Sequence, residues 1–239
     1  MVPQGVRRRR LSAVVTELGR FVTDARTRRS WLLRVRRDPK LFQPWNDTTI
    51  DRYPEVFAFL ATALASNPSA HILSFGCSTG EEVFSLRRYL PNARIKGIDI
   101  SRGNVADARR KLKSAPDSRL QFVVGATTEQ IASRSLDAVL CMAVFRHGDL
   151  SNSDADSCAH RLDFAEFSRC TEDLARCLKP GGFLAIEHSN FRFADTQIAA
   201  AFDCVFSIEK EFDPTRLLFG PDNKRLAVDS YGEVVFKKR

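Results

Sequence analysis

Residues 71–82 read His71-Ile-Leu-Ser-Phe-Gly-Cys-Ser-Thr-Gly-Glu-Glu82 and join a short apolar run to a glycine-rich turn. The apolar run has the length and composition of a buried strand, and the two glutamates open a helical pattern that Pro91 stops. Gly76 lets the backbone turn sharply off the strand, and we expect Gly80 to let a ligand approach the main chain where a Cβ would intrude. This strand–turn–helix unit predicts an α/β fold with a ligand site at the turn.

The same alternation continues toward the C-terminus. Further strands are expected at residues 94–100, 120–124, 136–144 and 183–187, with helical patterns over 101–112 and 161–178. Strands that alternate with helices form parallel sheets. The last two expected strands, 202–208 and 234–238, have no clear crossover helix between them and can pair antiparallel. The sequence therefore predicts a Rossmann-like, mostly parallel seven-stranded sheet with an antiparallel C-terminal strand.

The N-terminal part has a different character. Residues 1–40 carry twelve Lys/Arg against three acids, whereas the chain as a whole has a net charge of +8. Apolar residues spaced three and four apart over 11–25 predict an amphipathic helix. Its apolar face can pack on the main domain, or its arginines can bind an acidic substrate, a membrane surface or nucleic acid. We predict a basic helical extension and ordered loop over 1–55, followed by a catalytic domain over 56–239.

Composition restricts the class of protein. The chain has 239 residues, of which 44% are hydrophobic and 28% charged, as in ordinary globular proteins. No apolar run approaches the roughly 18 residues that a membrane span needs, and no secretory signal is visible, so we expect a cytoplasmic protein. The six cysteines form no C-x-x-C pair or zinc-ligand spacing. They are expected to be reduced, mostly buried thiols, with no metal bound.

The glycine turn favours one kind of cofactor over others. A dinucleotide fingerprint read from Gly76 would need glycines where Ser78 and Glu81 stand, and no P-loop lysine follows. Two glutamates at the start of a helix suit its dipole but repel a phosphate. They suit a cofactor that has no phosphate and carries a positive sulfonium and an amino group.

Asp99 ends the second expected strand, nineteen residues beyond Gly80. At that position a carboxylate can accept hydrogen bonds from the hydroxyls of a ribose. The alternative is that Asp99 caps the helix that begins near Ser101.

These residues resemble the class I S-adenosylmethionine-dependent methyltransferases. Phe75 to Glu82 is similar to the cofactor motif of the chemotaxis-receptor methyltransferases, and Asp137 to Cys141 and Leu178 to Gly182 resemble that family's fourth strand and its turn into the fifth. The resemblance implies S-adenosylmethionine as cofactor, with its methionine part near Gly76 and its ribose at Asp99. The cofactor-binding set that it implies is Gly76, Cys77, Ser78, Gly80, Glu81, Asp99, Ile100, Ala126, Cys141 and Met142.

Two departures bear on the methyl acceptor. Where the receptor methyltransferases have an Arg-Asn pair, this chain has Met142-Ala143, and no β-subdomain is inserted between the second and third strands. Activity on receptor glutamates is therefore disfavoured. Gly125-Ala126 also lacks the acid that many class I enzymes place against the adenine amino group.

The catalytic and substrate residues are open to more than one interpretation. His147 follows the fourth strand and can act as a general base, or it can be a loop histidine bonded to backbone. His188, Asn190 and Arg192 follow the fifth strand and can contact substrate, or they can form a solvated loop end. Methyl transfer mainly requires alignment of the reacting atoms, so few side chains are obligatory.

Three functions stay in view. The favoured one is methylation of an oxygen or nitrogen atom of a small-molecule acceptor. A protein carboxyl methyltransferase of the chemotaxis-receptor type is the second, and its acceptor would be a protein. The third is a non-catalytic, cofactor-sensing or nucleic-acid-binding protein that uses the basic N-terminal helix, although the motifs of nucleic-acid methyltransferases are absent.

Overall fold

The computed structural model describes residues 27–28, 31, 41–45, 48–151, 154–209, 217–228 and 231–239. Contacts divide the chain into two compact units, Met1–Asp38 and Pro39–Arg239. The expected amphipathic helix over 11–25 lies outside the described residues. The expected boundary at residue 55 lies within the larger unit, because Phe42 and Tyr53 are buried in its two apolar clusters. No helix in the described part of the chain is long and apolar enough to span a bilayer.

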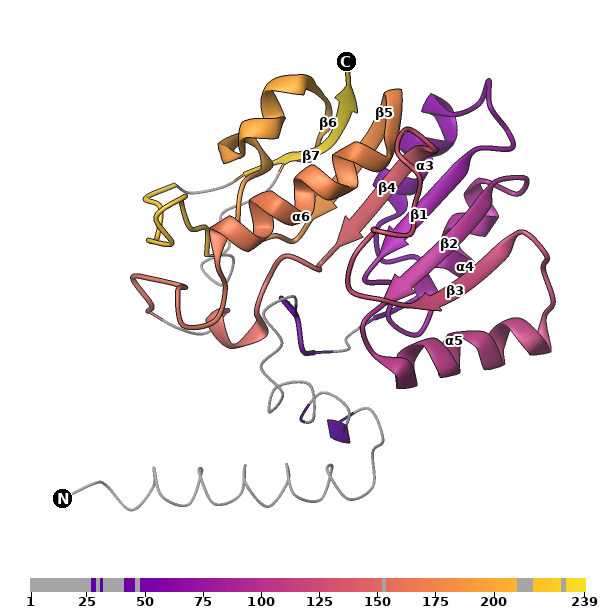
Figure 1. Cartoon of the computed structure of the whole chain (residues 1–239), viewed down its shortest axis with the longest axis horizontal. Coiled ribbons are helices and arrows are strands. Elements are labelled where there is room, and N and C mark those ends of the chain that lie inside the picture. The colour runs from indigo at the N-terminus through magenta and orange to yellow at the C-terminus, as the bar shows by residue number, and fades with distance from the viewer. Residues whose placement is uncertain are drawn as a thin grey trace. The chain divides into compact units, whose positions relative to one another are not determined.

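The larger unit alternates strands and helices along the chain (Figure 1). Its helices are α3 (Pro54–Ala63), α4 (Glu81–Tyr89), α5 (Arg102–Ser114) and α6 (Phe164–Cys177), with short 3-10 turns η1 (Gly148–Leu150), η2 (Phe193–Asp195) and η3 (Gln197–Ala201). Its strands are β1 (His71–Phe75), β2 (Arg94–Asp99), β3 (Leu120–Val124), β4 (Leu136–Met142), β5 (Leu178–Glu187), β6 (Phe202–Ser207) and β7 (Glu233–Lys238).

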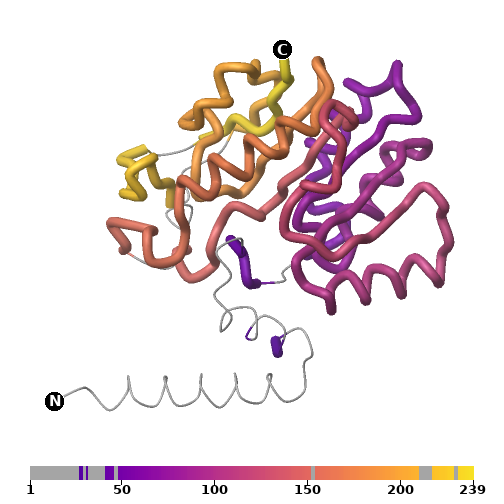
Figure 2. The backbone as a smooth tube through the Cα atoms, in the orientation of Figure 1, coloured from indigo at the N-terminus to yellow at the C-terminus, as the bar shows by residue number. Residues whose placement is uncertain are grey.

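The strands form one seven-stranded sheet in the order β3-β2-β1-β4-β5-β7-β6. All pairs from β3 to β5 are parallel, and β7 runs antiparallel to both of its neighbours. Figure 2 follows the chain from β1 outward to β3 and then back to β4, which lies on the other side of β1. The predicted Rossmann-like fold with an antiparallel C-terminal strand is confirmed, and the direction of winding reverses between β1 and β4.

Alternating side chains of the buried strands face two helical layers. On one face, Leu73 and Val139 belong to a cluster with Phe167 of α6. On the other face, Ile72 belongs to a cluster with Leu86 of α4. That second layer consists of α3, α4 and α5. With a helical layer on each face, the central strands β1 and β4 are buried along most of their length, as is typical of parallel sheets.

Local signals set most helix boundaries. The Ser101 hydroxyl accepts a 3.3 Å hydrogen bond from Asn104 N and caps α5, as predicted, and the Asp163 carboxylate caps α6 from Ala165 N. The fifth strand begins at Leu178, earlier than the expected Phe183, because Leu178 already pairs with Leu136 before a register shift. Gly181 and Gly182 lie between the two paired positions, within this irregular part of the strand.

Candidate functional site

A cavity of about 300 Å³ opens at the carboxyl ends of β1, β2 and β4. This is the edge at which the winding order reverses, where open α/β sheets bind their ligands. Residues from the loops after these strands line it, and so do residues from 41–45 and 48–53, which precede α3. The lining residues are Leu41, Phe42, Gln43, Trp45, Thr48, Thr49, Arg52, Tyr53, Phe57, Phe75, Gly76, Cys77, Ser78, Glu82, Asp99, Ile100, Gly125, Ala126, Met142, Ala143, Val144, Arg146 and Gly148.

The glycine turn is held against β2. Gly76 N and Cys77 N both donate to Ile98 O, at 2.8 and 3.0 Å. Gly76 has a φ of +75°, and a Cβ there would lie 2.5 Å from Val144 Cγ2. Both the backbone conformation and the space therefore require glycine, as the sequence predicted for a sharp turn off the strand.

Gly80 has a packing role that the sequence did not predict. It caps α4 with a φ of +92°, and a Cβ would lie 3.0 Å from Phe122 Cζ and from Phe84 Cε2. Gly80 does not line the cavity. The missing side chain makes room for the packing of α4 and α5 against β3, and the expected close approach of a ligand at Gly80 stays a prediction.

Asp99 anchors both the start of α5 and the glycine turn, and its predicted contact with a ribose stays a prediction. Its Oδ1 accepts hydrogen bonds from Ser101 N at 2.8 Å and Asn104 Nδ2 at 3.3 Å, next to the start of α5. Its Oδ2 accepts from Ser78 N at 2.8 Å and so fixes the glycine turn. Burial raises the pKa of Asp99, although these hydrogen bonds oppose the rise. A carboxylate has about four lone-pair positions, so Oδ2 keeps one for a ligand hydroxyl at the cavity wall.

Ser78 lines the cavity and carries an unsatisfied polar atom. Its Oγ is buried and has no hydrogen-bond partner among the described residues. The residue also has a φ of +49°, an uncommon value for a non-glycine residue. A buried hydroxyl without a partner costs free energy that a ligand's polar group would recover.

The two glutamates of the motif point to different places. Glu81 accepts a 2.6 Å hydrogen bond from Thr79 Oγ1 and forms an ion pair with Lys111 of α5, and it does not line the cavity. Burial acts to raise the pKa of Glu81, but the bonds from Lys111 and Thr79 outweigh it and leave that pKa lowered. Glu81 therefore fastens the glycine turn to α5.

Glu82 is the glutamate that lines the cavity, and sequence reasoning did not include it among the site residues. Its Oε1 accepts a 2.7 Å hydrogen bond from the buried Ser74 hydroxyl of β1. Burial raises the pKa of Glu82 to about 7, even though Ser74 and the Arg52 charge act to lower it. A positive ligand group in the cavity would favour the ionised form of this carboxylate.

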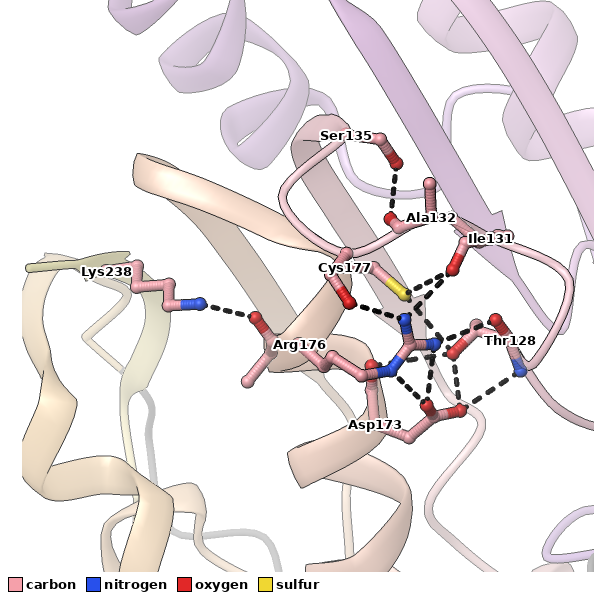
Figure 3. A network of polar contacts seen from close by, with 10 residues as sticks. Thr128, Ile131, Ala132, Ser135, Asp173, Arg176, Cys177 and Lys238 are labelled. Carbon is pink, nitrogen blue, oxygen red and sulfur yellow. Dashed lines mark hydrogen bonds and ion pairs between the residues drawn. The ribbon is translucent and has the colours of Figure 1, made fainter.

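The loop between β3 and β4 supplies Gly125 and Ala126 to the cavity, and a polar network holds it to α6 (Figure 3). Arg176 of α6 donates to Thr128 O and Ile131 O, each at 3.0 Å. Asp173 accepts from Thr128 N at 3.1 Å. The network fixes the loop just beyond Ala126, at the place that the resemblance assigns to the adenine.

Three of the predicted catalytic and substrate residues lie outside the cavity wall and form hydrogen bonds or ion pairs with other parts of the protein. His147 is buried, does not line the cavity, and its Nδ1 accepts from Asp149 N at 3.3 Å. Asn190 is also buried; its Oδ1 accepts from His147 N at 2.9 Å and its Nδ2 donates to Leu217 O at 2.7 Å. Arg192 forms a two-point ion pair with Asp195. Of the predicted cofactor residues, Cys141 is fully buried in β4 and also lies outside the cavity wall.

His188 is the predicted substrate residue that the structure places close to the cavity. Its Nδ1 lies 3.2 Å from the hydroxyl of Tyr53, which lines the cavity. Local sequence pattern could not have linked Tyr53 to His188, because the two residues are 135 positions apart. In the described part of the chain, no group of three His, Cys, Asp or Glu residues could hold a metal ion.

The site fits S-adenosylmethionine, the cofactor that the sequence predicted. Glu82 can face the positive groups, Asp99 Oδ2 has a lone pair for a ribose hydroxyl, and the buried Ser78 Oγ awaits a polar partner. No phosphate-binding cradle opens here, since the first helical residues are the two glutamates. Seven of the ten predicted cofactor residues line the cavity, namely Gly76, Cys77, Ser78, Asp99, Ile100, Ala126 and Met142.

Comparison with known proteins agrees with this assignment. Residues 73–186, a stretch just under half of the chain that runs from β1 to β5, match a family model described as a methyltransferase domain. The match shows that residues 73–186 are similar to a methyltransferase domain. No curated protein matches the chain. The specific likeness to chemotaxis-receptor methyltransferases stays a prediction.

The chain is also similar to solved structures over part of their lengths. One is a candidate S-adenosyl-L-methionine-dependent methyltransferase from Methanococcus maripaludis, with 16% identity over 56% of both chains and a TM-score of 0.38. Another is phosphoethanolamine N-methyltransferase 2 from Haemonchus contortus, with 21% identity over 59% of this chain and 29% of that one and a TM-score of 0.43. A third is a candidate sarcosine dimethylglycine methyltransferase from Galdieria sulphuraria, with 19% identity over 56% and 46% and a TM-score of 0.41. The chain spans well under two thirds of each.

Proposed function

We propose that this protein transfers a methyl group from S-adenosylmethionine to an oxygen or nitrogen atom of a small-molecule acceptor. The observation that carries the proposal is the cavity at the carboxyl ends of β1, β2 and β4, which is lined by the glycine turn at Ser78 and by the acidic residues Glu82 and Asp99. When bound, the cofactor supplies an electrophilic methyl group whose bond to sulfur breaks as the acceptor attacks, leaving the electron pair on sulfur.

The residues of the chain would divide the task of binding between them. Asp99 and Ser78 hold the glycine turn and offer acceptors to the ribose and the methionine part. Glu82 sits at the base of the cavity, fixed by Ser74, where it can balance the positive charge. His147 does not line the cavity, and we assign it no proton-transfer role.

Residues from 41–45 and 48–53 form one wall of the cavity, and this wall limits the size of the acceptor. The Trp45 ring packs on Gly148, where an added Cβ would lie 2.5 Å from Trp45 Cδ1. Phe42 packs edge-on against the buried Phe145, with ring centroids 5.1 Å apart. These contacts hold the segment over the site, and the remaining space suits a small molecule better than a folded protein loop.

Calorimetry with S-adenosylhomocysteine and S-adenosylmethionine tests cofactor binding. We expect both to bind, and we expect Asp99→Ala and Ser78→Ala to weaken them, whereas Asp222→Asn, a change at an exposed carboxylate, should not. Failure of the unaltered protein to bind either compound would overturn the proposal.

Transfer of label from methyl-labelled S-adenosylmethionine into cell extract then identifies the acceptor class. Label in the deproteinised fraction supports a small molecule. Label retained in the protein fraction, and released by mild base as a carboxyl methyl ester would be, supports the receptor-type alternative that the Ser78-Thr-Gly-Glu-Glu82 motif favours. Binding without transfer to either fraction would point to the non-catalytic alternative.

A further inference from the structure

Tyr53 lines the cavity, and its hydroxyl contacts an acid–base pair formed by His188 and the buried Glu187. Tyr53 precedes α3, lines the cavity, and is 9% exposed. Its hydroxyl lies 3.2 Å from His188 Nδ1, and the same nitrogen lies 3.6 Å from Glu187 Oε1. His188 does not itself line the cavity. The three side chains therefore form a chain that leads from the cavity wall to a buried carboxylate.

The backbone at the end of β5 is shaped to place His188 there. His188 has a φ of +51°, in the left-handed region that few non-glycine residues adopt and in which histidine is enriched among them. The end of β4 turns in the same way beside it, since Ala143 has a φ of +57° and its N donates to Glu187 O at 2.8 Å. Unfavourable backbone conformations that persist at a cavity edge are typical of functional sites.

Ring contacts hold Tyr53 in its orientation. Its ring packs edge-on against Phe57 of α3, with centroids 6.4 Å apart, and the His188 ring lies 5.6 Å away at a tilt. The Arg52 guanidinium lies 5.4 Å from the centroid of the Tyr53 ring. A phenylalanine could make all of these ring contacts, so packing alone does not account for the hydroxyl.

We propose that Tyr53 is a catalytic residue that takes up the proton of the methyl acceptor, with His188 as the positioning residue that receives the tyrosine's own proton. This inference rests on the proposed function. The acceptor's O–H or N–H donates to the Tyr53 oxygen while the Tyr53 O–H donates to His188 Nδ1. As the acceptor atom gains the methyl group, its proton passes to the Tyr53 oxygen and the phenolic proton passes to Nδ1. The resulting imidazolium lies beside Glu187, whose negative charge stabilises it.

The surroundings of Tyr53 favour this transfer through a neutral phenol over a mechanism in which Tyr53 is already deprotonated before the acceptor binds. Burial raises the pKa of Tyr53 far above its usual value, so the phenol stays protonated at neutral pH. A protonated phenol can accept a proton only if it gives up its own, and His188 Nδ1 is within reach. The other charged groups that act on it are Arg52 and Arg146, which lower its pKa, and Glu82 and Glu187, which raise it.

Three variants separate the hydroxyl from the surrounding structure. Tyr53→Phe removes the hydroxyl and keeps the ring contacts. His188→Asn keeps a side chain that tolerates a positive φ and can still accept a hydrogen bond, but cannot take up a proton. His160→Asn changes an exposed histidine and is the matched control.

Calorimetry with S-adenosylhomocysteine, label transfer from methyl-labelled S-adenosylmethionine into deproteinised extract, and 15N NMR of labelled histidine rings give three readouts. We expect all variants to bind S-adenosylhomocysteine like the unaltered protein. Tyr53→Phe and His188→Asn should slow transfer on the order of 10² to 10⁴-fold. In Tyr53→Phe the ring nitrogen signals of His188 should move, because Nδ1 loses its hydrogen-bond donor, while those of His160 stay in place.

The outcomes distinguish this inference from the proposed function. A protein that does not bind S-adenosylhomocysteine refutes the proposed function, whereas the NMR comparison remains readable without any cofactor. Transfer by Tyr53→Phe at the unaltered rate, or His188 ring signals identical in Tyr53→Phe and the unaltered protein, overturns the role of Tyr53 alone.

Discussion

The Ser74 hydroxyl donates a 2.7 Å hydrogen bond to Glu82 Oε1 and ties the buried first strand to the first turn of α4. Ser74 is fully buried, so its position is fixed by the sheet. This hydrogen bond fixes the position of Glu82 Oε1, and the Glu82 side chain lines the cavity. Because burial raises the pKa of Glu82 to about 7, the charge of this group changes within the physiological range.

The affinity for S-adenosylmethionine should therefore depend on pH through Glu82. A bound cation favours the ionised carboxylate, so binding should release a proton below about pH 7 and strengthen as pH rises to that value. The limiting slope is about tenfold per pH unit for one proton. Calorimetry from pH 5.5 to 8.5, in buffers of different ionisation enthalpy, measures both quantities.

Glu82→Gln keeps an oxygen for the Ser74 bond and removes the ionisation. Its affinity should be nearly independent of pH and weaker than that of the unaltered protein at pH 8. Glu55→Gln, a change at an exposed glutamate of α3, is the control. If the affinity of the unaltered protein for S-adenosylmethionine did not change with pH, Glu82 would not interact with the positive groups of the cofactor.

Glu82 should also make the unliganded protein less stable as pH rises. Its pKa is about 7 in the folded chain against an ordinary value of 4.5, so the folded state binds more protons between these values. The free energy of unfolding should then fall between about pH 4.5 and pH 7, by up to about 3 kcal/mol, and level off above. Urea unfolding of Glu82→Gln should show no such decline, which makes this variant the more stable protein at pH 8. Equal stabilities of the two proteins at pH 8 would show that Glu82 ionises without cost.

Because side chains crowd around Gly80, we expect Gly80→Ala to lower the free energy of unfolding by more than backbone strain alone would. Ala at a positive φ costs about 1 to 2 kcal/mol at either Gly80 or Gly181, whose φ values are +92° and +77°. At Gly181 the nearest atom to an added Cβ is Lys237 Cε at 4.0 Å, whereas at Gly80 two phenylalanine rings lie at 3.0 Å. Urea unfolding should therefore show a loss for Gly80→Ala that exceeds the loss for Gly181→Ala by about 1 to 3 kcal/mol. Similar losses would mean that the rings give way freely.

The sequence predicted what depends on local pattern. The alternation of apolar runs and helical spacing predicted the succession of strands and helices along the chain. Ser101 was predicted to be a cap because it stands directly before a helical pattern. The turn at Gly76 was also readable, since a sharp departure from a strand into a helix needs glycine. These features need no knowledge of which residues meet in space.

Side-chain direction and long-range contact were not readable in the same way. Glu81 and Glu82 are adjacent on one helix, but successive residues point about 100° apart, so only one can face the cavity. The packing role of Gly80 could not be predicted because the ring of Phe122, which fills the space beside it, lies more than forty positions away. Tyr53 and His188 are 135 positions apart and come into contact only in the folded structure.

Asn190 should prove to be a structural residue rather than a substrate contact. It is 6% exposed and connects two loops, accepting from His147 N and donating to Leu217 O. Asn190→Ala would leave a buried N–H and a buried C=O without partners, at about 1 to 3 kcal/mol for each. Thermal and urea unfolding should show this loss, whereas Asn92→Ala, a change at an exposed asparagine, should not. Below the unfolding transition the affinity for S-adenosylhomocysteine should be unchanged, because neither partner of Asn190 lines the cavity. A variant of full stability whose KM for the acceptor rises would instead return Asn190 to the substrate site.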